Sequence, residues 1–120
     1  MTTVTHVEPA KVSKSHLVPV AMIDMSVPEF SEACGITFRH EKDDLDEYFA
    51  LYLDISGTPA ALKRYNGEPP KGITIYLEST LAEKAADRII GKILKHYNLT
   101  KDRISWRESL PVTVGDSSSA

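Results

Sequence analysis

The side chains that could do chemistry are few and lie far apart in the sequence. Histidine occurs at His6, His16, His40 and His96, and no two of these residues share the spacing that places metal ligands on one turn of a helix. The single cysteine, Cys34, would need a basic neighbour to act as a nucleophile and is better explained as a small buried side chain. No glycine-rich phosphate loop, nucleophile elbow or Cys-x-x-Cys motif is present. The sequence therefore predicts no catalytic, cofactor-binding or metal-binding residue, and it disfavours an enzyme.

Acidic side chains are concentrated in one short stretch. It contains Glu41, Asp43, Asp44, Asp46 and Glu47. The stretch lacks the alternating oxygen ligands and the fixed glycine of a calcium loop. We expect a charged turn between two strands that keeps the sheet edge from aggregating. If the stretch has a function, the hypothesis is that its negative charge steers a basic partner toward this end of the protein.

Basic side chains recur along one predicted helix, on the side opposite its apolar residues. They are Lys84, Arg88, Lys92 and Lys95. Exposed helix faces are normally rich in lysine and arginine, so a solvated surface is the simplest interpretation. A nucleic-acid contact is the alternative. The net charge of −3 disfavours it, because such binding depends on neutralising phosphates.

Tyrosine and arginine side chains alternate with the predicted core residues along several strands. The polar set of alternate positions comprises Thr37, Arg39, Tyr48, Ala50, Tyr52, Asp54, Thr74, Tyr76, Ser105 and Arg107. Tyrosine and arginine are enriched where proteins bind each other. We therefore predict that a protein partner or a second copy binds Arg39, Tyr48, Tyr52, Tyr76 and Arg107 together with Asp43, Asp44, Asp46 and Glu47. The alternatives are a solvated or arm-covered face and, less favoured, a platform for single-stranded RNA.

The elements that must position these residues are clearest near the C-terminal end. Alternation predicts strands over Ile73–Glu78 and Ile104–Arg107. Apolar residues at spacings of three and four predict a helix from Leu81 to Tyr97. A capping box of Thr80 and Glu83 would begin this helix, and Asn98 would end it in the left-handed conformation. We expect the two strands to run parallel, whether or not they are neighbours.

The middle of the chain predicts a helix and a hairpin. Ser26, Pro28 and Glu29 begin a short helix from Val27 to Cys34, which Gly35 closes. Alternating residues 36–41 and 48–55 then form an antiparallel hairpin. For residues 58–67 a helix is slightly favoured over a strand that returns from a turn at residues 56–57.

The run from Ile73 to Glu108, with residues 99–104 linking helix to strand, resembles half of a tautomerase-type unit. The resemblance covers only part of the chain, and we do not infer membership of that family. The catalytic proline of tautomerases follows the initiator methionine, whereas Thr2 occupies that position here. The resemblance therefore implies a shared local architecture without that catalysis.

The chain has 120 residues, 42% of them hydrophobic, which suits one globular domain. We expect a flexible or partner-docking arm over residues 1–25, a domain over 26–110 and a disordered tail over 111–120. The longest apolar run is too short for a membrane helix, and one cysteine fits a reducing compartment, so we expect a cytoplasmic protein.

The predicted fold is an α+β two-layer sandwich. Its mixed sheet of four to five strands, in the order α-β-β-(α or β)-β-α-β, carries one long amphipathic helix on one face. The predicted function is a small interaction or regulatory module. The alternatives are a small enzyme or ligand-binding protein with its pocket at a subunit interface, and nucleic-acid binding through the basic helix.

Overall fold

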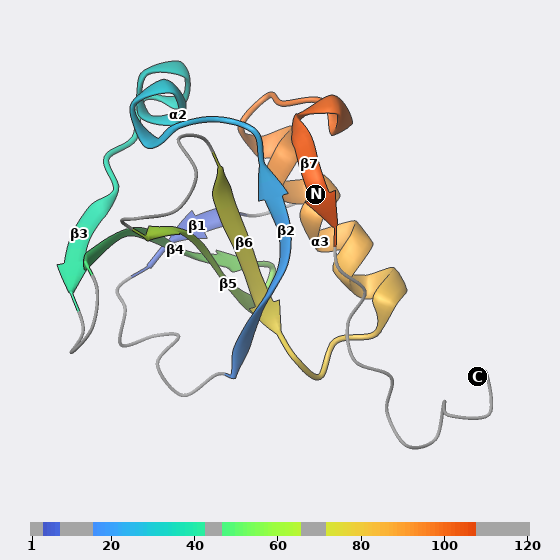
Figure 1. The fold of residues 1–120 in the computed structure, drawn as a ribbon. Helices are drawn as coiled ribbons and strands as arrows, with labels where there is room; N and C mark the ends of the chain where they lie inside the picture. Colours follow the sequence, from blue (N-terminus) through green and yellow to red (C-terminus); the bar gives the residue numbers. More distant parts are fainter. Residues whose placement is uncertain (1–3, 8–15, 43–46, 66–71, 108–120) are drawn as a thin grey trace.

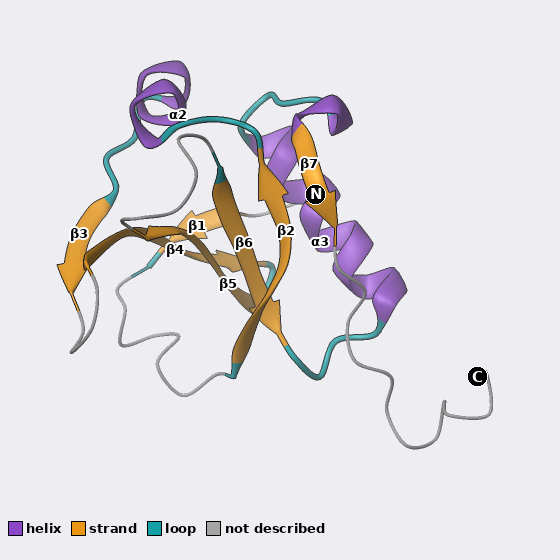
Figure 2. Cartoon of the chain, in the orientation of Figure 1, coloured by secondary structure: helices purple, strands orange, loops and turns teal. Residues whose placement is uncertain are grey.

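The structure is a computed structural model that describes residues 4–7, 16–42, 47–65 and 72–107. These residues form one sheet of seven strands with two α-helices and a short 3-10 helix (Figures 1 and 2). The strands are β1 (Val4–His6), β2 (Leu17–Ile23), β3 (Arg39–Lys42), β4 (Glu47–Ile55), β5 (Thr58–Tyr65), β6 (Ile73–Glu78) and β7 (Ile104–Arg107). The helices are α2 (Val27–Cys34), α3 (Glu83–His96) and the 3-10 helix η1 (Lys101–Arg103).

The strands follow the order β1-β4-β5-β6-β2-β7, and β3 also pairs with β4. Strands β3 and β1 pair with opposite ends of β4, at residues 47–50 and 53–55. Every pairing between described strands is antiparallel. The α+β class is confirmed, whereas the sheet has more strands than predicted and is not mixed in its pairings. Strands β6 and β7 run in the same direction, as predicted, with β2 between them.

Strand β2 lies inside the sheet, where the sequence analysis expected an arm. Val20, Ala21 and Ile23 are fully buried. The alternation of this strand is hidden in the sequence because its register shifts between Pro19 and Ala21, which leaves Val20 as an extra residue. The described parts of residues 1–25 therefore belong to the sheet, and the predicted tail over 111–120 lies outside the described residues.

Strand β5 replaces the helix that was slightly favoured for residues 58–67, so that prediction was wrong. Ser56 and Gly57 both have positive φ, at 51° and 94°, as a two-residue turn between antiparallel strands requires. The Asp54 carboxylate accepts a hydrogen bond of 3.0 Å from the backbone N–H of Gly57. This turn sends the chain straight back along β4.

The two helices begin differently. Helix α2 has the predicted capping box of Ser26 and Glu29, and Gly35 follows it in the left-handed conformation. At the start of α3 the N-cap is Ala82, which makes no side-chain capping bond, so the predicted capping box of Thr80 and Glu83 is wrong. Asn98 has a φ of 59° as predicted at the other end of α3.

Helix α3 packs on one face of the sheet (Figure 1). The core there includes Leu51, Leu53, Ile55, Ile73, Ile75, Leu77, Ala86, Ile89, Ile90, Ile93 and Leu94. The fully buried ring of Phe30 links α2 to this core through edge contacts with Phe38 and Tyr97, at centroid distances of 5.7 and 5.0 Å. No helix in the described part of the chain is long and apolar enough to cross a membrane.

Candidate functional site

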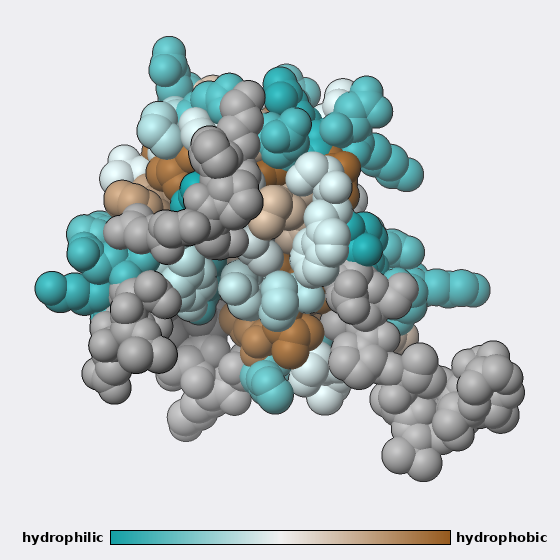
Figure 3. All heavy atoms as spheres, viewed as in Figure 1, coloured by the Kyte–Doolittle hydropathy of each residue, from teal (hydrophilic) through white to brown (hydrophobic). Residues whose placement is uncertain are grey.

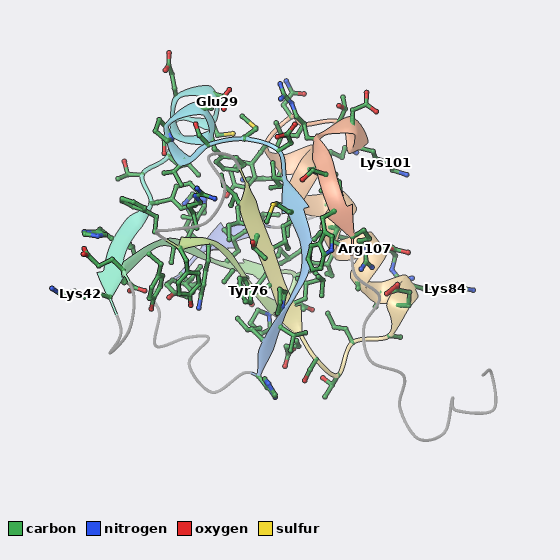
Figure 4. All side chains as sticks on the ribbon, viewed as in Figure 1. Glu29, Lys42, Tyr76, Lys84, Lys101 and Arg107 are labelled. Carbon is green, nitrogen blue, oxygen red and sulfur yellow. The ribbon has the colours of Figure 1, made fainter. Side chains whose placement is uncertain are left out.

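The structure brings together the three tyrosines of the predicted partner-binding face. Tyr48, Tyr52 and Tyr76 surround the Lys63 ammonium, whose Nζ lies 5.2, 5.9 and 5.2 Å from their ring centroids. Small residues, Ala50 and Ala61, lie beneath these rings in a second apolar cluster on the face that carries Tyr76 (Figure 4). In the space-filling view, residues of intermediate to high hydropathy occupy the middle of this side of the molecule (Figure 3).

Tyr52 is the buried member of that cluster, with 7% of its surface exposed. Its hydroxyl donates a hydrogen bond of 2.7 Å to Oε1 of Glu41. Burial of the ring, and then the bond to Glu41, raise the pKa of Tyr52 above its ordinary value. Tyr52 therefore stabilises the fold, and Tyr48 and Tyr76 are the more accessible tyrosines of this face.

The two predicted arginines point in different directions. Arg39, on β3, forms a 3.4 Å ion pair with Glu41 and is half exposed. Arg107 was expected on the same face of the sheet as Tyr76, facing away from the long helix, and this expectation is wrong. Its guanidinium donates to Glu83 at 3.1 Å and to Asp87 at 2.8 Å, both on α3.

A β-bulge explains the reversal. Ile23 pairs with Ile104 and Met22 pairs with Trp106, so Ser105 is an extra residue on β7. The residues after the bulge exchange faces, which turns Arg107 toward α3. Trp106, which strict alternation with Ile104 would direct into the core, is instead 40% exposed.

The acidic stretch is described only in part. Asp43, Asp44 and Asp46 lie outside the described residues. Oε1 of Glu47 lies 2.9 Å from Nε2 of His40. The steering of a basic partner by this stretch stays a prediction.

The predicted basic stripe lies along α3 and is exposed at three of its four positions. Lys84, Arg88 and Lys95 are exposed and Lys92 is half-buried. Lys84 points away from the sheet (Figure 4). A role for this stripe in binding stays a prediction.

A groove that the sequence analysis did not predict lies between α3 and β7. Its volume is about 360 Å³. We call it the edge groove. Its lining residues are Asp87, Ile90, Gly91, Leu94, Lys101, Ile104 and Arg107. Apolar groups form its middle. Its charged residues include Lys101 and Arg107, which lie near opposite ends of β7 (Figure 4).

Gly91 keeps the edge groove open. A Cβ atom at this position would meet no atom within 4 Å, so packing does not require a glycine here. Glycine inside a helix costs about 0.5–1 kcal/mol relative to alanine. The missing side chain therefore serves no packing purpose that the structure shows, and its effect is to leave space over Ile90 and Leu94.

Strand β7 ends the sheet on this side and pairs with β2 alone among the described strands. The opposite edge is partly formed by β3, whose four residues are Arg39, His40, Glu41 and Lys42, and such polar edges resist pairing with other chains. In contrast, β7 carries Ile104, Ser105 and Trp106, and its one charged side chain turns toward α3. Trp106 is also the large hydrophobic residue that is exposed in the described part of the chain.

The remaining reactive groups are engaged elsewhere. Sγ of Cys34 donates to the carbonyl oxygen of Tyr97 at 3.8 Å, and burial raises the pKa of this thiol. Nε2 of His6 lies 2.9 Å from the Tyr97 hydroxyl, and burial, followed by the charge of His96, lowers the pKa of His6. In the described ranges no three His, Cys, Asp or Glu side chains gather as metal ligands would.

Sequence reasoning missed the site at the edge of β7. The signal that pointed to it is Gly91, a glycine within a strongly amphipathic helix. Comparisons of this chain with protein-family models, with curated proteins and with solved structures find no match.

Proposed function

We propose that this protein is an interaction module that binds an extended segment of a polypeptide along the outer edge of β7. The observation that carries this proposal is the position of the edge groove, which lies directly beside an edge strand that exposes Trp106. A strand added to β7 gains backbone hydrogen bonds, and every second side chain of it faces the groove.

The chemistry of the edge groove suits a peptide. An apolar side chain would enter between Ile90, Leu94 and Ile104, and an acidic side chain would meet Lys101, which is exposed. Tryptophan is among the residues that most often dominate the binding energy of an interface. A small-molecule site is less favoured because the groove is open to solvent, and two of its polar residues, Asp87 and Arg107, already bind each other.

The tyrosine cluster is a second candidate contact surface, as the enrichment of tyrosine at interfaces suggests. Tyr76 is the residue with which to test it, because Tyr52 is buried and its replacement would also destabilise the fold. We place the module in the cytoplasm, since a chain with a single cysteine suits a reducing compartment.

Selection from a displayed library of random peptides tests the proposal at β7. The protein is immobilised at low density, and the control is Gly91→Leu, which fills the edge groove without a clash at Cβ. We expect the wild-type protein to enrich peptides that pair an apolar with an acidic residue. The Gly91→Leu variant should not retain them. Equal retention by both proteins, or no enrichment on either, would contradict the proposal.

A further inference from the structure

We infer that the strand bound along β7 is β7 of a second copy of this chain. Two copies would then form a twofold-symmetric dimer in which their sheets join into one. This inference rests on the proposed function, because it names the occupant of the same edge.

The first support is the pairing pattern. Each described strand pair of the sheet is antiparallel. An antiparallel pair of identical strands obeys a twofold axis, so every favourable contact occurs twice. With the axis between Ser105 and Trp106, Trp106 lies opposite Ser105 of the second copy, and Ile104 lies opposite its Arg107. The indole of Trp106 is then shielded from solvent by the second copy, and the small side chain of Ser105 leaves room for it.

The second support is the placement of charged side chains near the two ends of β7. At one end Arg107 binds the groove residue Asp87 and also Glu83, which lies on α3 outside the groove lining, so two carboxylates meet one guanidinium there. At the other end lies Lys101. Antiparallel pairing brings Lys101 of each copy next to Glu83 and Asp87 of the other. A parallel arrangement would instead place like charges together.

The third support is the apolar surface. The two edge grooves lie on the same side of the joined sheet, so Ile90, Leu94 and Ile104 of one copy face the groove of the other, with Ile104 opposite Arg107 of the second copy. Gly91 adds no side chain to this surface, which lets the two α3 helices approach each other. One contact would thus account for the exposed indole, the helical glycine and an outer edge of β7 that no described strand covers.

Sedimentation equilibrium over micromolar to millimolar concentrations, with a charge swap, tests this geometry. Lys101→Glu faces Asp87 of the second copy, and Asp87→Lys faces Lys101, so each variant alone should bind itself about tenfold or more weakly than the wild type does. Mixed in equal amounts, the two variants form complementary pairs at both contacts, and the wild-type affinity should return. Asp87→Lys removes one of the two carboxylates that hold Arg107, so circular dichroism checks that each variant folds. The recovery of affinity in the mixture is the deciding result, because a β7 strand that was merely loosened would not regain it.

Three results would overturn the inference. These are a wild-type protein that stays monomeric at millimolar concentration, single variants that dimerise as the wild type does, and a mixture that associates no better than its components. The peptide selection at low density is independent of dimerisation. A protein that stays monomeric but still selects groove-dependent peptides would contradict the dimer and would support the proposed function.

Discussion

Arg107 and Asp87 connect the edge strand β7 to helix α3, with Nη2 of the arginine 2.8 Å from Oδ1 of the aspartate. The same guanidinium donates to Glu83, and through Nη1 to the carbonyl oxygen of Val20 on β2 at 3.3 Å. One side chain therefore fixes a four-residue strand against both of its neighbours.

Loss of this link should loosen β7. We expect Arg107→Gln to lower the free energy of unfolding by about 1–2 kcal/mol, because charge-assisted hydrogen bonds are lost from a half-buried position. Urea unfolding measures the change. The matched control is Arg88→Gln on the exposed side of α3, which should change the stability by less than about 0.5 kcal/mol. Equal effects of the two variants would contradict this role of Arg107.

Two glycines should respond to alanine in opposite ways. Gly91→Ala should raise the free energy of unfolding by about 0.5–1 kcal/mol, because alanine favours the helix and meets no atom within 4 Å. Gly35→Ala should lower it by about 1 kcal/mol, because φ there is 68°. Thermal unfolding of both variants checks the signs. A Gly91→Ala variant that melts below the wild type would show that the helix is strained there.

The two predicted capping boxes should differ in energy. Ser26→Ala should cost about 1 kcal/mol, since the Ser26 hydroxyl accepts from the backbone N–H of Glu29 at 3.2 Å. Thr80→Ala should cost less than about 0.5 kcal/mol, since Ala82 begins α3. Chemical denaturation of the Ser26→Ala and Thr80→Ala variants measures the two losses of stability. Equal losses would show that both hydroxyls cap their helices.

The burial of Tyr52, and then its hydrogen bond to Glu41, should make stability fall at alkaline pH. The pKa of Tyr52 is raised in the folded protein, so the unfolded chain loses the phenolic proton first, near pH 10. The contribution of this group is complete below about pH 10 and falls as the pH rises further. Guanidinium unfolding between pH 8 and 12 should therefore show a shallower alkaline loss in Tyr52→Phe than in the wild type. Parallel curves for the two proteins would refute this assignment.

Trp106 provides a direct optical signal, because it is the single tryptophan of the chain. It is 40% exposed, so we expect red-shifted emission and quenching by acrylamide in dilute solution. At concentrations where copies pair, the emission should shift to the blue and quenching should weaken. The Lys101→Glu variant is the control, since it should keep the dilute spectrum over the whole range.

Several elements were predicted correctly from local signals, although the local signals at Thr80 and over residues 58–67 were misleading. Helix α2 has its capping box and its left-handed glycine within one short contiguous stretch, from Ser26 to Gly35. Strand β6 alternates without interruption, and α3 has a clear apolar side. These features depend on nearby residues, so pattern alone reveals them.

The rest depends on pairings between distant residues. Val20 and Ser105 are bulge residues, and each shifts the alternation of its strand by one position. The first bulge concealed a central strand, and the second reversed the expected directions of Trp106 and Arg107. The edge groove combines residues of α3 with residues of η1 and β7, so only the packed structure could bring them together.

The central position of β2 has a consequence for how the chain is synthesised. Strand β2 leaves the ribosome before either of its neighbours, because Ile23 pairs with Ile73 on one side and with Ile104 on the other. Until those residues emerge, a largely apolar strand that contributes Val20, Ala21 and Ile23 to the buried core has no native neighbour on either side. Such long-range closure slows folding and exposes nascent chains to aggregation. The growing polypeptide therefore depends on its last strands to protect one of its first.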